Sequence, residues 1–323
     1  MEKSKDFFNR KDAGNDYVRL IADGKIKKGL GVGCEDTDKH IRFKKGTFNV
    51  ILGHRNVGKT AFINFYLSLH TVASGYKQLI YSPENTIGNY KRDLVQFLTG
   101  QPINGQKGRI NPTLLEAALD FISSNYTFVN TLNRWSAFEI LDKAADNADS
   151  HQILVIDPYN SLAVQDGYRS MNKHDYDYEV ASRMRIYCEQ TGNTLYLPMH
   201  ATTESLRRIH KDGKYVGMIS PPQDGDAEGG GKWANRCDDF MIVHRYAKSK
   251  VEWMNTLIQV DKVKDTATGG KPTAHDEAVV WEMKDYGTKY ISKGVNSLGK
   301  HIDLMAYAKK VREGNPRLPK INF

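Results

Sequence analysis

The octapeptide GHRNVGKT, residues 53–60, constrains the fold of this chain more than any other stretch of its sequence. It fits the pattern G-x-x-x-x-G-K-[ST], in which two glycines allow a tight turn whose backbone N–H groups point at phosphates. In this pattern Lys59 contacts the β- and γ-phosphates, and the hydroxyl of Thr60 is a ligand of Mg²⁺. A β-leaning run at 47–52 precedes the loop and a helical pattern at 59–74 follows it, which is the context that the motif requires. The chain is therefore predicted to bind a nucleoside triphosphate, ATP being the expected one, together with Mg²⁺.

The predicted nucleotide-binding residues cover the whole loop and the residue after it. They are Gly53, His54, Arg55, Asn56, Val57, Gly58, Lys59, Thr60 and Ala61. A helix that begins at Lys59 adds the positive end of its dipole to this phosphate site.

The remaining pattern of the chain predicts an α/β fold. Short apolar runs alternate with helical patterns from residue 47 onward, which indicates a mainly parallel central sheet flanked by helices on both faces. The closing runs at 239–245, 255–263 and 277–283 are rich in strand signals, so we expect an antiparallel extension at the C-terminal edge.

Composition narrows the class of protein and of partner. The formal net charge of +8 favours an anionic partner, although only weakly. No apolar run approaches the length of a membrane span, and the charged N-terminus does not fit a signal peptide, so a cytoplasmic protein without a membrane partner is expected. Cys34, Cys188 and Cys237 are scattered without metal-ligand spacing or a disulfide framework.

Two carboxylates follow predicted strands that lie beyond the phosphate loop in sequence. Asp157 ends the run ILVID, about a hundred residues after the loop, and such a residue holds Mg²⁺ through its water shell in phosphate-loop folds. Glu84 follows LIYSP, at the carboxyl edge of a parallel sheet where a base can deprotonate the attacking water. The alternatives are a strand-end cap for Asp157 and an acid at a helix start for Glu84.

A histidine and a basic segment complete the set of candidate residues. His200 ends the run TLYLPMH, where it can sense the γ-phosphate or be merely structural. The polar, glycine-rich excursion at 201–232 follows it directly, and such a long irregular segment is usually functional or disordered. Its basic side chains are the predicted DNA contacts, unless they only solubilise a surface loop: Arg207, Arg208, Lys211, Lys214 and Lys232.

Five motifs, taken in order, resemble those of the hexameric RecA-like replicative helicases, a family that includes DnaB, phage primase–helicases and Twinkle. They are GHRNVGKT, YSPEN, LVIDPYNSL, LPMHATTES and GGGKWANRCDDFMIVHR. The resemblance covers roughly residues 25–292 and favours the Twinkle and phage branch, because PEN follows the second strand and a histidine, rather than a glutamine, stands at the end of the family's third motif. It implies a domain organisation of an N-terminal lead-in at 1–24, a RecA-like ATPase domain at 25–292 and a basic C-terminal tail at 293–323.

The resemblance also implies roles and partners. Glu84 would be the catalytic base, Asp157 the metal-holding carboxylate and His200 the sensor that couples the nucleotide to DNA. The loops after Leu162 and after His200 would line a central channel that holds single-stranded DNA in a hexameric ring, and a primase or another replisome protein is a candidate partner.

The sequence departs from the family at two points. No primase-like region precedes the core, so priming activity is not expected. Where the family carries a lysine and an arginine that reach the neighbouring active site, this chain has Lys262 and Lys264, two residues apart on one face of a strand. Lysine lacks the planar, bidentate fork of arginine, and the alternative is that both are solvated on an edge strand.

Three functions remain open at this point. The leading one is an ATP-driven, ring-forming DNA helicase. The second is a RecA- or KaiC-like ATPase that coats DNA without unwinding it, and the third is a nucleotide-dependent assembly component with slow or absent hydrolysis.

Overall fold

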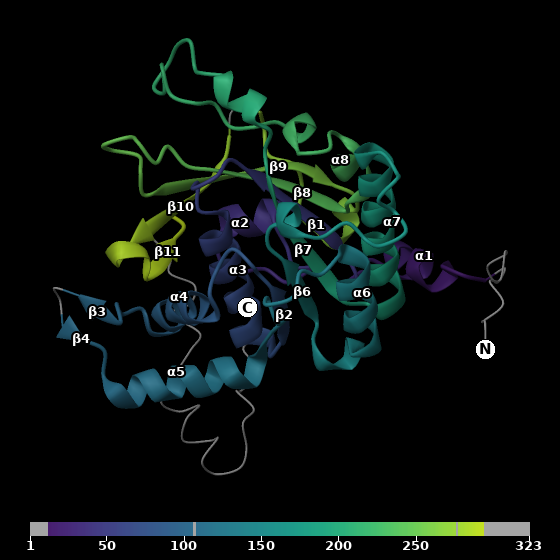
Figure 1. The fold of residues 1–323 in the computed structure, drawn as a ribbon, viewed down its shortest axis with the longest axis horizontal. Coiled ribbons are helices and arrows are strands. Elements are labelled where there is room, and N and C mark those ends of the chain that lie inside the picture. The colour runs from purple at the N-terminus through teal and green to yellow at the C-terminus, as the bar shows by residue number, and fades with distance from the viewer. Residues whose placement is uncertain (1–11, 106–107, 276, 294–323) are drawn as a thin grey trace.

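The computed structural model describes residues 12–105, 108–275 and 277–293. Within these residues a nine-stranded sheet forms the centre of the molecule, in the order β11-β10-β9-β8-β1-β7-β6-β2-β5 (Figure 1). Its strands are β1 (Phe48–Gly53), β2 (Gln78–Tyr81), β5 (Tyr126–Phe128), β6 (Ile153–Ile156), β7 (Thr194–His200), β8 (Asp239–His244), β9 (Asn255–Val263), β10 (Val279–Lys284) and β11 (Lys289–Ile291). A separate pair, β3 (Asn104–Gly105) and β4 (Gly108–Arg109), is antiparallel.

The sheet has a parallel part and an antiparallel part. Strands β8, β1, β7, β6, β2 and β5 pair in parallel, whereas β9, β10 and β11 continue the sheet beyond β8 in antiparallel pairs. The predicted fold class, a mainly parallel sheet with an antiparallel extension at the C-terminal edge, is confirmed.

Several helices begin or end at residues that suit those positions. Ser136 and Glu139 form the capping box of α6, and Gly75 ends α3 in the left-handed conformation at φ 68°. The helices are α1 (Asn15–Ala22), α2 (Glu35–His40), α3 (Lys59–Ser74), α4 (Ile87–Thr99), α5 (Pro112–Asn125), α6 (Ala137–Asp146), α7 (Lys173–Thr191) and α8 (Lys232–Arg236).

Two apolar clusters cover the two faces of the sheet. Helices α3, α4 and α5 contribute to one cluster, and α6, α7 and α8 contribute to the other. Along β1, Ile51 belongs to the first cluster while Phe48, Val50 and Leu52 belong to the second, because successive side chains of a strand point to opposite faces. This packing fixes the carboxyl ends of the parallel strands, where the loops of the site begin.

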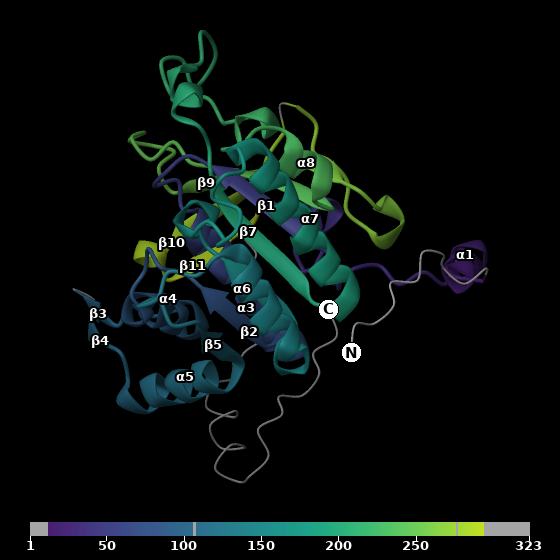
Figure 2. The same cartoon turned by 45° about the vertical axis from the view of Figure 1, so that its right-hand side comes forward.

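The excursion at 201–232 contains short ordered elements within a mainly irregular segment. It contains the short helices η3 (Thr203–Arg207) and η4 (Asp224–Asp226), and an antiparallel bridge joins Ile209 to Ile219. Residues 208–220 therefore form a hairpin, and this part of the chain projects at the top of Figures 1 and 2. Apart from these short elements the excursion is irregular, as its polar and glycine-rich sequence predicts.

The described ends of the chain add one further element. Helix α1 stands apart from the sheet in both views (Figures 1 and 2), and none of its residues is buried. The predicted basic tail lies outside the described residues except for Lys293. Among the residues that the structure describes, no helix has both the length and the apolar character needed to cross a lipid bilayer.

Candidate functional site

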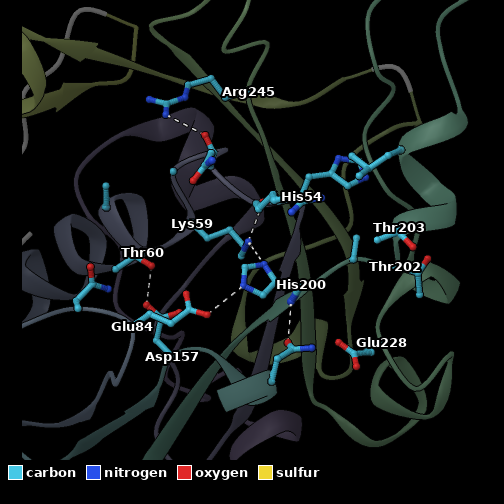
Figure 3. Close-up of a pocket in the computed structure, with 18 of the residues that line it drawn as sticks. His54, Lys59, Thr60, Glu84, Asp157, His200, Thr202, Thr203, Glu228 and Arg245 are labelled. Carbon is cyan, nitrogen blue, oxygen red and sulfur yellow. Dashed lines mark hydrogen bonds and ion pairs between the residues drawn. The ribbon is translucent and has the colours of Figure 1, made fainter. Parts of the chain in front are cut away.

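A cavity of about 1010 Å³ opens where β1, β2, β6 and β7 end (Figure 3). Five residues predicted from four motifs line this one cavity: Lys59, Thr60, Glu84, Asp157 and His200. They come together because the carboxyl ends of parallel strands lie at the same edge of a sheet.

The loop between β1 and α3 requires both of its predicted glycines. A Cβ atom on Gly53 would stand 2.4 Å from the backbone oxygen of Val243, so a side chain there would collide with β8. Gly58 has a φ of 89°, a conformation that L side chains rarely adopt. Of the other predicted nucleotide-binding residues, His54, Arg55, Asn56 and Ala61 line the cavity, whereas Val57 is buried and does not line it.

Lys59 is folded back on its own loop. Its Nζ donates to the backbone oxygens of Gly53 at 2.9 Å and His54 at 2.8 Å, and to Nδ1 of His200 at 3.2 Å. Burial lowers the pKa of the ammonium to about 8, while the neighbouring carboxylates Asp157 and Glu84 oppose this shift. A phosphate oxygen carries a negative charge, so it would be a better acceptor for the ammonium than the neutral backbone oxygens that it contacts here.

Thr60 and Asp157 provide two oxygen atoms that suit a magnesium ion. The Thr60 hydroxyl donates to Oδ2 of Asp157 at 2.6 Å. Burial raises the pKa of Asp157 to about 6, with the bond from Thr60 and the charge of Lys59 acting against the shift. A buried carboxylate of this kind gains from a nearby cation, and Mg²⁺ prefers oxygen ligands. The residues present therefore fit the predicted ion.

Glu84 and His200 lie beside each other in the cavity, next to Lys59 (Figure 3). Oε1 of Glu84 lies 3.7 Å from Nε2 of His200, and the Glu84 side chain is 56% exposed to the cavity and solvent. Since Lys59 donates to Nδ1, the hydrogen of the neutral imidazole stands on Nε2, facing Glu84. Burial and the charge of Lys59 lower the pKa of His200, and Glu84 opposes them. His200 is thereby placed between the phosphate-binding lysine and the candidate base.

The alternative role of Glu84 as a helix-start acid is not supported. The N-cap of α4 is Thr86, whose side chain accepts from the backbone N–H of Asn89, and no acidic residue occupies the first turn. Glu84 instead lies in the turn between β2 and that cap.

Two further cavity residues were not singled out from the sequence. Asn160 accepts the backbone N–H of His200 at 3.3 Å, and Arg245 donates to the backbone oxygen of Asn56 at 3.3 Å. Arg245 directly follows β8, so the strand-end rule that identified Asp157 and His200 applies to it equally.

Lys262 and Lys264 lie outside the cavity and contact their own chain. Lys262 donates to the backbone oxygens of Ala234, Asn235 and Cys237 at 2.6, 3.3 and 2.8 Å, which satisfies the C-terminal carbonyls of α8. The ammonium of Lys264 lies 3.7 Å from Asp238, and its side chain is 49% exposed. Of the two, Lys264 is the one free to reach another molecule.

The predicted DNA contacts divide into exposed and buried residues. Arg207, Lys211 and Lys214 are exposed, and Arg208 is half-buried against Asp226.

Lys232 does not fit a DNA contact, and its prediction is corrected. Its side chain is 4% exposed, with Nζ donating to the backbone oxygen of His174 at 2.9 Å and lying 3.6 Å from Asp177. A phosphate backbone on the surface has no access to this ammonium.

Comparison with known proteins was made for both sequence and structure. No protein-family model matches the chain. In sequence it is similar to the Twinkle homolog protein, chloroplastic/mitochondrial, of Arabidopsis thaliana, at 24% identity over 275 residues. The match covers 82% of this chain and 36% of the relative, so the chain spans about a third of that relative's length.

Solved structures share the fold. An ATPase domain superposes with a TM-score of 0.70 at 13% identity, covering 89% of this chain and 99% of that domain. A DnaB-like replicative helicase, described together with its interactions with primase, gives 0.66 at 16% identity, covering 90% of this chain and 68% of the other. A KaiC-like protein from Pyrococcus horikoshii gives 0.51 at 13% identity, covering 83% and 97%. With the Twinkle homolog, these structures confirm the predicted resemblance to the RecA-like replicative helicase family.

Proposed function

We propose that this chain, which resembles the RecA-like replicative helicases in sequence and fold, is the ATP-driven motor module of a DNA helicase that translocates on single-stranded DNA. The observation that carries the proposal is the position of His200. It contacts Lys59 and Glu84 in the cavity and is the last residue before the excursion with the basic hairpin. A displacement of His200 on loss of the γ-phosphate would thus be passed along the backbone to the segment proposed to hold DNA.

The residues of the cavity divide the work of ATP hydrolysis. Lys59 and the loop N–H groups bind the phosphates, and Glu84 orients and deprotonates the attacking water. Mg²⁺, held by Thr60 and through water by Asp157, would neutralise phosphate charge. His200 receives a hydrogen bond from Lys59, so it loses that partner when the lysine turns to a phosphate.

We propose that copies of the chain assemble into a ring, six being the number that the family resemblance suggests. Helix α1 supports assembly, because its apolar side chains Tyr17, Val18, Leu20 and Ile21 are exposed on this chain. A helix with an exposed apolar face gains stability by packing on another surface. In the proposed ring, α1 of one copy packs on the surface of the neighbouring copy.

The assembly prediction concerns the two lysines at the end of β9. If they complete a neighbouring copy's site, hydrolysis per subunit rises steeply with protein concentration. Subunits lacking both lysines, mixed with Glu84→Gln subunits, should regain part of the activity, because some interfaces then hold one complete site. Activity that is independent of concentration, in a protein that sediments as a monomer, contradicts shared sites.

Single substitutions then separate the two lysines. Lys264→Ala is expected to reduce hydrolysis without lowering the melting temperature, since its side chain is half exposed. Lys262→Ala removes three hydrogen bonds from the end of α8 and should destabilise the fold by about 1–3 kcal/mol.

The DNA prediction concerns the exposed basic residues of the excursion. Removing one phosphate contact is expected to weaken single-stranded DNA binding at all sequences alike and to reduce the salt slope by about 0.7 per contact. The test is a salt titration of binding for Arg207→Ala and Lys211→Ala. Lys77→Ala is the matched control, because Lys77 is exposed at the opposite edge of the sheet, just before β2. An unchanged slope in both excursion variants moves the DNA site elsewhere.

A RecA- or KaiC-like ATPase that coats DNA is the second candidate, since the KaiC-like protein shares the fold. Electron microscopy with an ATP analogue and single-stranded DNA separates the two, closed rings favouring the helicase and filaments the coating protein. Hydrolysis that DNA does not stimulate would favour a slow assembly component instead.

A helicase of this kind would act in the compartment that holds the replicating DNA, and a primase is a candidate partner.

A further inference from the structure

His54 occupies a variable position of the phosphate loop, and its buried side chain contacts the excursion at the edge of the cavity. It is 4% exposed, and its Nε2 lies 2.8 Å from the hydroxyl oxygen of Ser205 in η3. The Ser205 hydroxyl donates its single hydrogen to the backbone oxygen of Thr202 at 2.6 Å. Ser205 is therefore the acceptor, and Nε2–H of His54 is the donor. Figure 3 shows His54 between Lys59 and the segment that carries Thr202 and Thr203.

A series of aromatic ring contacts connects His54 to the hairpin. His54 and His244 meet edge to face at 6.0 Å between centroids, and His244 meets Tyr246 at 4.7 Å. Tyr246 stacks on Tyr215 of the 208–220 hairpin at 4.0 Å. The hydroxyl of Tyr246 also lies 2.8 Å from Nε2 of His210, on the other arm of the hairpin. The segment just before the hairpin is thus held by the bond between His54 and Ser205, and the hairpin itself by the contacts of Tyr246 with His210 and Tyr215.

We propose that His54 is a positioning residue that couples the phosphate loop to the 208–220 hairpin. It does so by its hydrogen bond to Ser205 and by the ring contacts through His244 and Tyr246. This inference rests on the proposed function only in taking the hairpin as the DNA-binding segment. The link is separate from His200, which reaches the excursion along the backbone. Since Lys59 holds the backbone oxygen of His54, movement of Lys59 to a phosphate frees the residue that bears the coupling side chain.

The chemistry of His54 suits a fixed connection. Burial, together with the charges of Lys59 and Arg208, lowers its pKa to about 4, so the ring is neutral at physiological pH. A neutral ring with its hydrogen on Nε2 keeps one geometry toward Ser205. Well-packed buried contacts transmit small shifts because they have few alternative arrangements.

The test is hydrogen–deuterium exchange of residues 208–220, with and without a non-hydrolysable ATP analogue and Mg²⁺ at saturation, in the absence of DNA. In the unmodified chain the analogue is expected to change the exchange of the hairpin. His54→Ala and Ser205→Ala should each reduce that nucleotide-dependent change by about fivefold, the equivalent of one hydrogen bond. The double variant should lose no more than either single variant, since the two residues share one interaction.

Two controls keep the result interpretable. Ser182→Ala removes an exposed serine of α7 that bonds only to the backbone oxygen of Tyr178, and it should leave the response unchanged. His54→Gln keeps a side-chain N–H donor and should restore part of the response. A merely structural role would lower stability in the variants without altering the nucleotide dependence.

The outcomes for the link and for the function are distinct. A full nucleotide response in Ser205→Ala, or no response in the unmodified chain, overturns the coupling through His54. A response that depends on His54 in a protein that does not bind DNA preserves the coupling and removes the proposed function.

Discussion

Glu84→Gln is expected to lower the turnover of ATP by about 10²–10⁴-fold while nucleotide affinity stays nearly unchanged. Glutamine has the shape of glutamate and keeps a hydrogen-bonding oxygen beside His200, but it cannot accept a proton from water. In the proposed mechanism phosphate binding depends on Lys59 and the loop, which the substitution leaves unchanged. Single-turnover hydrolysis, with analogue binding measured separately, checks both parts of the expectation.

The matched control for this variant is Glu228→Gln. Glu228 lines the same cavity but belongs to the excursion. Its backbone N–H donates to the backbone oxygen of His200 at 3.3 Å, a bond that the substitution leaves in place, and its carboxylate lies 4.0 Å from the ammonium of Lys173. This variant should retain turnover within a few-fold. Near-normal turnover in Glu84→Gln would leave Glu84 as a residue of the turn before α4, without a part in the chemistry.

Lys59→Ala is expected to abolish measurable hydrolysis and to weaken ATP binding. The ammonium lies in the cavity against the backbone oxygens of the loop, and loss of one donor to the reacting group typically costs about 10²–10³-fold in rate. Its removal also leaves the backbone oxygens of Gly53 and His54 without a donor that they now share. Rate and affinity should therefore fall together.

The measurement for Lys59→Ala is hydrolysis at saturating ATP, with analogue affinity determined by titration. Lys77→Ala serves again as the exposed control, and thermal melting verifies that both variants are folded. Hydrolysis by Lys59→Ala at a normal rate would mean that the phosphates bind elsewhere.

The site could be predicted where its residues follow strand ends. Each of Asp157, Glu84 and His200 comes at or after the carboxyl end of a parallel strand, and the topology of such sheets brings those ends together. The helix after the phosphate loop was predicted to its last residue, because Lys59 and Gly75 mark its ends in the sequence itself. Local chemistry was sufficient for these features.

Contacts between distant segments could not be predicted in this way. Lys232 reads as a surface cation in a glycine-rich stretch, yet Asp177 of α7 pairs with it in the interior. Lys262 ends a strand pattern, but its contacts are the carbonyls of α8, more than twenty residues earlier. His54 pairs with Ser205 at a separation of 151 residues. Each of these partners is set by tertiary packing, which no local pattern encodes.

Strand displacement on a forked DNA duplex tests the central claim most directly. With ATP and Mg²⁺, the unmodified chain is expected to release the labelled strand at a rate that rises with ATP, whereas Glu84→Gln at the same concentration should bind the fork and release none. DNA-stimulated hydrolysis without any strand release, under conditions where the fork is bound, would contradict a helicase and favour an ATPase that coats DNA.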